Sequence, residues 1–330
     1  MLKFVQFDNF QLVELPYLKD ELGATENPCV FTDKSGEVIS IEINDLDVET
    51  LQPLSKFKHL QKLTLPLFPK RNFSLDFIAK LVNLKQLTIS HSEITDIEPL
   101  KFCTKIEALY LNNNKIENIN PLSNLFSLHT LFINYNKVSD LQPLALLSNL
   151  LLFVASNNMI EDTNALKDLI NLENVDLSNN LIRDISPMRY LRKITDLNLS
   201  ENKIENIDSI GYMKNLEDLR LYYNLIEDIR GLTNLTKLRN LGMTGNRIKN
   251  IQPAGSLISI ENMGFAANEI EIIPNFDKLV NLKNLYLSHN KISNIDQIAS
   301  IHNLDYLTLQ ENNIENVDIL SNNSIKNLIF

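Results

Sequence analysis

The chain has 330 residues, a formal net charge of −10 and two cysteines. The excess of acidic residues weighs against nucleic acid or an anionic membrane surface as a partner, because both attract surplus lysine and arginine. Two cysteines are too few for a disulfide framework in a chain of this length, and no apolar run is long enough to span a bilayer.

The first 37 residues lie outside the repeating part of the chain, and we predict that residues 1–37 form an N-terminal cap. Residues 1–10 mix apolar and polar side chains in a pattern compatible with a strand, and residues 17–22 are compatible with a helical turn. Two β-prone runs then flank Asp33–Gly36, which has the composition of a hairpin turn. This hairpin should cover apolar core that the first repeat would otherwise expose.

Residues 38–330 repeat with a period of 22, and asparagine marks the period. It recurs ten times, at Asn114, Asn136, Asn158, Asn180, Asn202, Asn224, Asn246, Asn268, Asn290 and Asn312. An isoleucine or valine follows two residues after each of these asparagines. A fixed period of this size is typical of a solenoid, in which each repeat forms one coil and packs against its neighbours. The region holds about 13 full repeats and the strand of a fourteenth.

The earliest repeats depart from the pattern. Leu46 and Ser92 stand where the later repeats have asparagine, and two extra residues with Pro66 and Pro69 predict a bulged connection. At the other end, Leu328 and Phe330 match the strand residues of the fourteenth repeat. Because an unpaired edge strand invites pairing, we expect either that another chain or domain covers it or that the native protein continues beyond Phe330.

The spacing within one repeat predicts how each coil folds. In Leu109 and Leu111 the apolar residues alternate, so both point to one side of a short strand, and stacked coils place such strands in one parallel sheet. Asn114 then turns the chain, and its amide is expected to serve backbone groups of its own coil and the next. Proline opens the return segment of six repeats, where a fixed φ helps and no N–H is required: 53, 99, 121, 143, 187 and 253.

The pattern L-x-x-L-x-L-x-x-N-x-I is the leucine-rich repeat signature. The run NNLIRDISPMRYLRKITDLNL, from Asn179 to Leu199, resembles the 22-residue repeat class of bacterial internalins and of the leucine-rich regulatory subunit of type-1 protein phosphatase. This resemblance covers roughly residues 38–330. It implies an α/β leucine-rich-repeat solenoid: a curved right-handed superhelix with a parallel β-sheet on its concave side and short helical or irregular segments on its convex side.

Function should lie at strand positions that the coil does not require, which line the concave surface. Three such residues form a predicted apolar patch, Tyr110, Phe132 and Val154, with Tyr135 and Leu152 beside them. Exposed apolar patches commonly mark interaction sites, and aromatic residues tend to dominate interface energies. The alternative is that short strands simply favour aromatic and β-branched side chains.

Charged and aromatic residues follow along the same surface. The predicted partner-binding set here is Asp176, Asp196, Asp218, Arg220, Tyr222, Tyr223 and Tyr286. We interpret it as an acidic patch followed by an aromatic and cationic one, suited to a partner segment that bears lysine or arginine. Gly242 and Gly264 should leave a shallow floor before Tyr286. A solvated charged surface is the alternative for the charges, and low-cost variation for the glycines.

The sequence offers little for catalysis. It contains no phosphate-binding glycine loop, no HExxH motif and no paired CxxC motif, and its five histidines are scattered. We therefore expect no enzyme, no cofactor and no metal site. The first ten residues lack the apolar core of a signal peptide, and the cysteine usage suits a reducing compartment, so we expect a cytoplasmic location.

The predicted function is a non-catalytic protein–protein interaction module that binds a protein or peptide partner on its concave face. No nucleic acid and no membrane is expected among its partners. Two alternatives stay open: a regulatory subunit of a type-1-like protein phosphatase, and the recognition domain of a larger enzyme or secreted effector. Co-purification with a phosphatase would favour the first alternative, and a longer reading frame the second.

Overall fold

The computed structural model describes residues 11–44, 49–65, 74–301, 304–315, 318–320 and 325–330. The chain clusters into two compact units, Met1–Met159 and Ile160–Phe330, and each is described by itself. Three sequence predictions lie outside the described residues: the strand in residues 1–10, the role of Leu46, and the bulged connection at Pro66 and Pro69.

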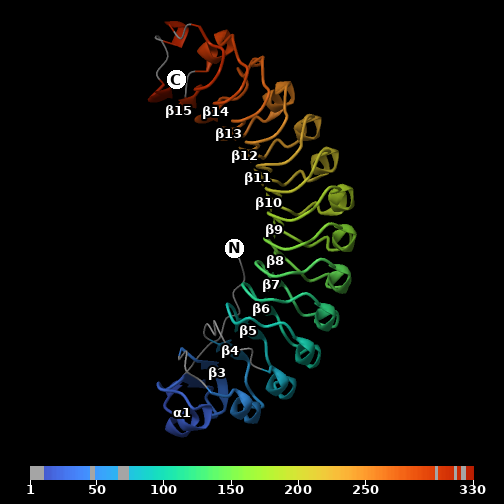
Figure 1. Ribbon diagram of the computed structural model, residues 1–330, viewed down its shortest axis with the longest axis vertical. Coiled ribbons are helices and arrows are strands. Elements are labelled where there is room, and N and C mark those ends of the chain that lie inside the picture. The colour runs from blue at the N-terminus through green and yellow to red at the C-terminus, as the bar shows by residue number, and fades with distance from the viewer. Residues whose placement is uncertain (1–10, 45–48, 66–73, 302–303, 316–317, 321–324) are drawn as a thin grey trace. The chain divides into compact units, whose positions relative to one another are not determined.

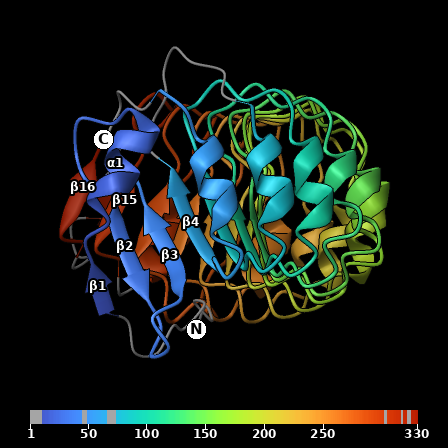
Figure 2. The same ribbon diagram turned by 90° about the horizontal axis from the view of Figure 1, so that it is seen from below.

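The N-terminal part of the first unit combines one helix with three strands. Helix α1 (Pro16–Leu22) falls where the sequence predicts a helical turn, and its C-cap Gly23 takes the left-handed conformation that glycine adopts without strain. Strands β2 (Cys29–Thr32) and β3 (Val38–Glu42) form an antiparallel hairpin, and β1 (Gln11–Val13) pairs with β2 on the other side (Figure 2). The sequence did not predict β1.

A side-chain oxygen holds the hairpin turn together. Asp33 Oδ1 accepts hydrogen bonds from the backbone N–H of Ser35 at 2.8 Å and of Glu37 at 3.1 Å, as well as from the Ser35 hydroxyl at 2.6 Å. These hydrogen bonds lower the pKa of Asp33, with the hydroxyl of Ser35 as the main cause. A short polar side chain that bonds its own turn is the reason aspartate is frequent in such turns.

From β3 onward each coil contributes one short strand, and neighbouring strands are parallel. The first unit continues with β4 (Lys62–Leu65), β5 (Gln86–Ile89), β6 (Ala108–Tyr110), β7 (Thr130–Phe132) and β8 (Leu152–Val154). The second unit contains β9 (Asn174–Asp176), β10 (Asp196–Asn198), β11 (Asp218–Arg220), β12 (Asn240–Gly242), β13 (Asn262–Gly264), β14 (Asn284–Tyr286), β15 (Tyr306–Thr308) and β16 (Asn327–Ile329).

Short 3-10 helices lie in most of the return segments, on the side of the coil opposite its strand (Figure 1), but the return segment between β13 and β14 contains none. In the first unit they are η1 (Gln52–Lys56), η2 (Asp76–Lys80), η3 (Glu98–Phe102), η4 (Asn120–Leu122) and η5 (Gln142–Leu144). In the second they are η6 (Asn164–Leu166), η7 (Ser186–Tyr190), η8 (Asp208–Tyr212), η9 (Arg230–Leu232), η10 (Gln252–Ser256), η11 (Asp296–Ser300) and η12 (Asp318–Leu320). All six predicted prolines lie in the first turn of such a helix.

Leucine and isoleucine fill the space between strand and return segment. In the coil that contains β6, Leu109, Leu111, Ile116 and Leu122 are completely buried, as the periodic pattern predicts. The described coils of each unit repeat this pattern of buried apolar residues, as expected for a solenoid in which each coil packs against its neighbours. The predicted leucine-rich-repeat solenoid with a parallel sheet is therefore confirmed.

The repeated asparagines form a hydrogen-bonded ladder, which we call the asparagine ladder. In Asn202, Oδ1 accepts the backbone N–H of Ile182 at 3.0 Å, and Nδ2 donates to the carbonyl oxygens of Leu177 at 2.9 Å and Leu199 at 3.1 Å. Eight of the ten asparagines are buried, and Asn158 and Asn312 are half-buried. The ladder is confirmed, but its direction is opposite to our expectation: each amide serves its own coil and the preceding coil.

A left-handed residue precedes each ladder asparagine. The φ angles of these residues lie between 51° and 57°, except for Gly245 at 74°, and the others are Asn113, Tyr135, Asn157, Asn179, Glu201, Tyr223, Ala267, His289 and Glu311. Such backbone costs on the order of 1 kcal/mol for a residue with a Cβ. Hydrogen bonds to the following coil offset the cost, as from Glu201 N–H to the carbonyl oxygen of Tyr222 at 2.7 Å.

The two cysteines are free and differ in burial. Burial raises the pKa of the Cys103 thiol to about 12, and its Sγ lies 3.4 Å from the carbonyl oxygen of Ile78. Only the thiolate reacts readily with alkylating agents. Iodoacetamide at pH 8 should therefore modify half-buried Cys29 and leave Cys103 unmodified in the folded protein, which mass spectrometry of the digested chain would show.

Denatured protein provides the control for this labelling, because both thiols should then react. Rapid modification of Cys103 in the folded protein would contradict the packing of this coil.

Candidate functional site

The strand residues that do not enter the core form a regular column in each unit, which we call the strand column. It consists of the last residue of each short strand, or the equivalent position of a longer one, and parallel pairing aligns these residues side by side. In the first unit the column is Glu42, Thr64, Thr88, Tyr110, Phe132 and Val154. All six side chains are half-buried, so each one presents part of its surface to solvent.

Tyr110 and Phe132 stack on each other in the first unit. Their ring centroids are 5.2 Å apart and the ring planes are inclined by 29°. Val154 continues the column beside Phe132, and half-buried Leu152 lies on the same strand, β8. Burial raises the pKa of the Tyr110 hydroxyl. We call Tyr110, Phe132, Leu152 and Val154 the apolar patch. An exposed stacked pair suits a surface that is covered on binding.

The other predicted residue of this region, Tyr135, lies outside the strand column. It occupies the left-handed turn position after β7, with φ 55°, and its side chain is 53% exposed. Asn134, which precedes it, has a buried Oδ1 without a hydrogen-bond partner. The sequence predicted Tyr135 beside the apolar strand residues, but it did not reveal the left-handed turn at Tyr135, between the strand and the ladder asparagine.

In the second unit, Arg220 joins two aspartates from neighbouring strands. Its Nη2 lies 2.9 Å from Asp218 Oδ1 and 3.4 Å from Asp196 Oδ2. Asp196 and Asp218 are aligned on β10 and β11, so two like charges stand side by side and share one guanidinium. The predicted acidic and cationic patches are thus one cluster of charges.

Two further predicted residues are engaged in local structure. Asp176 Oδ1 accepts hydrogen bonds from the backbone N–H of Ser178 at 2.9 Å and from its hydroxyl at 2.6 Å. Tyr223 occupies the left-handed turn position, and a Cβ added at Gly245 would lie 2.4 Å from its ring. Tyr223 therefore packs along the turns, apart from the strand column.

The two consecutive glycines of the strand column create a hollow, as the sequence predicts. It measures about 180 Å³, and its lining includes Gly242, Gly264, Tyr222 and Tyr286. A Cβ at Gly242 would lie 2.2 Å from Tyr222 Cζ, so the Tyr222 ring covers this glycine. A Cβ at Gly264 would find its nearest atoms at 3.7 Å, which is ordinary contact distance, so a methyl group fits there without a clash. We call this feature the glycine hollow.

Two asparagines that the sequence analysis passed over also line the glycine hollow. Asn262 Nδ2 donates to Asn240 Oδ1 at 2.6 Å, and Asn284 Nδ2 donates to Asn262 Oδ1. Asn240 and Asn262 stand two residues before the two glycines, and Asn284 stands two residues before Tyr286, each pair on the same strand. The signal that could have revealed them was present, because they recur at the repeat period of 22 in the first position of β12, β13 and β14.

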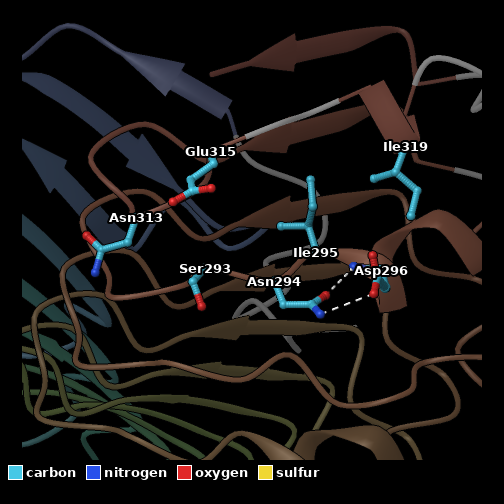
Figure 3. A pocket seen from close by; sticks show the side chains of 7 residues that line it. All are labelled: Ser293, Asn294, Ile295, Asp296, Asn313, Glu315 and Ile319. Atoms are coloured by element: carbon cyan, nitrogen blue, oxygen red, sulfur yellow. Dashed lines mark hydrogen bonds between the residues drawn. The ribbon is translucent and has the colours of Figure 1, made fainter.

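A larger hollow, of about 450 Å³, lies beside the coils that carry η11 and η12 (Figure 3). Its polar groups largely serve the turn: Asn294 Oδ1 accepts the backbone N–H of Asp296 at 2.8 Å, and Asn294 Nδ2 donates to Asp296 Oδ2 at 3.1 Å. The lining contains none of the residues that the sequence singled out. Its amide and carboxylate groups cap a 3-10 helix, which is a structural role.

Within the described residues, no group of three or more histidine, cysteine, aspartate or glutamate side chains is placed to hold a metal ion. No helix among the described residues has the length and apolar character needed to cross a membrane. The cytoplasmic location that we expect from the sequence stays a prediction.

Asp196 makes the stability of the second unit depend on pH. Burial raises the pKa of its carboxyl group, Asp218 and Asp176 add to this effect, and Arg220 opposes it. The folded state therefore holds the proton more tightly than the unfolded state. This contribution to stability is complete below the ordinary aspartate pKa of about 4 and is lost as the pH rises through the raised pKa.

We therefore expect the melting temperature of Asp196→Asn, measured as its difference from wild type, to be higher at pH 7 than at pH 3. Arg220 keeps its closer partner, Asp218, in this variant. Thermal melts at both pH values would test the expectation, with exposed Asp168→Asn as the control. A difference between variant and wild type that does not change with pH would contradict the assigned burial of Asp196.

The chain was compared with protein-family profiles, with curated proteins and with solved structures. A sequence profile described as "Leucine Rich repeats (2 copies)" matches residues 82–124, 214–258 and 280–322. A sequence comparison with curated proteins finds no match. Among solved structures, an internalin (InlF) of Listeria monocytogenes is 26% identical, with a TM-score of 0.83 over 95% of this chain and 93% of that chain.

Two further structures share the fold at lower identity. A leucine-rich repeat protein of Leptospira interrogans is 20% identical, with a TM-score of 0.63 over 87% of this chain and 89% of that chain. The plant peptide hormone receptor RGFR1, solved in complex with RGF2, is 17% identical, with a TM-score of 0.55 over 84% of this chain and 60% of that chain. At these identities the likeness concerns the fold alone.

Proposed function

We propose, from the premise that this chain is a leucine-rich repeat protein, that it is a non-catalytic module whose strand-column face binds another protein. Proteins of the internalin and receptor-ectodomain type are generally interaction modules, and one of the similar receptors was solved in complex with RGF2. The proposal for this chain concerns the face that is used and the kind of partner. The phosphatase-subunit and effector-domain alternatives stay predictions.

The observation that carries the proposal is the apolar patch of the first unit. Tyr110 and Phe132 stack on each other in a column that the coil itself does not require to be aromatic, since Thr88 occupies the same column. Both rings keep solvent-exposed surface although the core beneath them is complete. Large, preformed aromatic surfaces lose little side-chain entropy on binding and commonly anchor protein interfaces.

Affinity capture from a lysate of the native organism, followed by mass spectrometry, tests the proposal. The wild-type protein should enrich one or a few proteins that the Tyr110→Ala/Phe132→Ala double variant fails to enrich. Phe126→Ala is the matched control, because Phe126 is an exposed aromatic residue, 52% exposed, that lies outside the strand column. Equal enrichment by the wild type and the double variant would show that the apolar patch is not the binding site.

A further inference from the structure

The glycine hollow is the one place in the described strand columns where two successive members carry no side chain. Arg220 precedes the two glycines in the column, and Tyr286 follows them. The floor of the hollow is therefore backbone of β12 and β13, with Gly242 buried beneath the Tyr222 ring and Gly264 half-buried. A paired guanidinium closes the hollow at one end and a phenol ring closes it at the other. A side chain of a partner that enters the hollow would fill the space that the side chains of other column residues occupy.

The size and lining of the hollow select the kind of side chain. A cavity of about 150 Å³ holds one benzene ring, so a hollow of about 180 Å³ suits one aromatic or branched aliphatic side chain. Some of its polar groups already contact one another: Arg220 forms an ion pair with Asp218, and Asn262 donates a hydrogen bond to Asn240. The phenol rings of Tyr222 and Tyr286 offer apolar surface with hydroxyl groups that can reach solvent or a partner backbone.

The charges beside the hollow determine which charge is favoured on the partner residue that lies next to the one in the hollow. One guanidinium faces the two carboxylates of Asp196 and Asp218, and Asp176 stands in the same column two strands before Arg220. The region has more negative than positive charge, which also contributes to the raised pKa of Asp196. Charge complementarity therefore favours a basic side chain at this position.

The distance between the carboxylates and the glycine hollow determines how far apart the basic and the apolar residue of the partner lie. The carboxylates lie on β10 and β11 and the hollow on β12 and β13, which is about two strand spacings, or roughly 10 Å. In an extended peptide, residues i and i+2 point to the same side and lie about 7 Å apart. The long side chain of lysine or arginine covers the remaining distance while its charged group stays in water.

We propose that the glycine hollow is a specificity pocket for an extended partner segment, in which an aromatic or branched aliphatic side chain enters the hollow and a basic residue two positions away contacts Asp196 and Asp218. This inference rests on the proposed function and locates a second anchor in the second unit, separate from the apolar patch.

A library of phage-displayed random dodecapeptides is a suitable probe, because it assumes no partner. Selection on the full-length wild-type chain should enrich sequences with lysine or arginine two residues from phenylalanine, tyrosine or leucine. Synthetic versions of the enriched peptides should lose affinity about tenfold or more when the apolar residue is replaced by alanine, as buried interface anchors do. Replacement of the basic residue should weaken binding less, and this part should fade at high salt.

Variants of the protein locate the binding site. Gly264→Leu fills the hollow and should abolish peptide binding, whereas Thr88→Leu, at the equivalent column position of the first unit, should leave it unchanged. Circular dichroism and thermal melts would confirm that both variants fold. Gly264→Ala is a gentler second variant, since its methyl group finds only ordinary contacts, and it should weaken binding without loss of stability.

Three results would overturn the inference: no enriched peptide, enriched peptides without the basic and apolar pair, or equal binding to wild type and Gly264→Leu. Peptides whose binding requires Tyr110 and Phe132 but tolerates Gly264→Leu would support the proposed function and overturn this inference. Peptides that need only a basic residue would show that the hollow accepts a cation between its tyrosines, which also contradicts the proposal.

Discussion

Replacement of Asn224 by alanine will lower the free energy of unfolding by about 3 kcal/mol, because it leaves buried backbone groups of two coils unpaired. Asn224 is 4% exposed. Its Oδ1 accepts the N–H of Ile204 at 3.0 Å, and its Nδ2 donates to the carbonyl oxygen of Leu199 at 2.9 Å. Both partners are in the preceding coil, so the variant loses bonds between coils as well as within one.

Urea denaturation followed by circular dichroism would measure this loss. Asn234→Ala is the matched control, since Asn234 is exposed and outside the ladder, and it should change stability by less than about 0.5 kcal/mol. Asn224→Asp should be worse than alanine, because it would bury a carboxylate against the carbonyl oxygen of Leu199. If Asn224→Ala unfolded at the same urea concentration as wild type, the asparagine ladder would not be an energetic link between coils.

The second large effect concerns binding at the apolar patch. Once capture identifies a partner, Phe132→Ala should weaken the complex by about 2 kcal/mol or more, which corresponds to an affinity about 30-fold lower. Tyr110→Ala should have an effect of similar size. Because the two rings stack at 5.2 Å, the losses should not add, and the coupling energy should be about 0.5–1.5 kcal/mol.

Isothermal titration of the wild type, both single variants and the double variant provides this double-mutant cycle. Strictly additive losses would mean that the partner contacts each ring separately. An unchanged affinity in both single variants would place the binding site elsewhere on the chain, with Arg220→Ala as the next variant to test.

The repeat pattern predicted most of the fold because the core residues are the ones that recur. Leu109, Leu111, Asn114 and Ile116 recur in every regular coil, and each recurrence reflects the same physical need: apolar packing or a paired backbone group. The prolines likewise predicted the 3-10 helices, since a fixed φ and a missing N–H suit only the first turn.

The missed features leave no distinct mark in a periodic sequence. A period of 22 residues is the same in both directions along the chain, so it does not show whether Asn114 serves the next coil or the preceding one. The left-handed turns are occupied by residues such as Tyr135 and Glu201, where glycine would have been the usual signal. Strand β1 has only three residues, which is too short for an alternating pattern to identify it.

The sequence predicted which residues of the candidate sites are aligned on neighbouring strands, but it did not predict the contacts between their side chains. Side by side alignment of Tyr110 with Phe132, and of Gly242 with Gly264, follows from the repeat alone. The sharing of Arg220 between two aspartates and the position of Tyr222 over Gly242 depend on side-chain rotamers, which the spacing of residues does not determine.

The direction of the asparagine ladder has a consequence for symmetry. Each coil receives hydrogen bonds from the asparagine of the coil that follows it, so the two faces of a coil differ: one supplies amide groups and the other accepts them. A two-fold axis brings identical faces together. No ladder bond can then form across such an interface, whereas a head-to-tail contact joins unlike faces and can extend the ladder. End-to-end association through the ladder would therefore be heterologous, and a closed dimer of this chain would have to form without ladder bonds between its two copies.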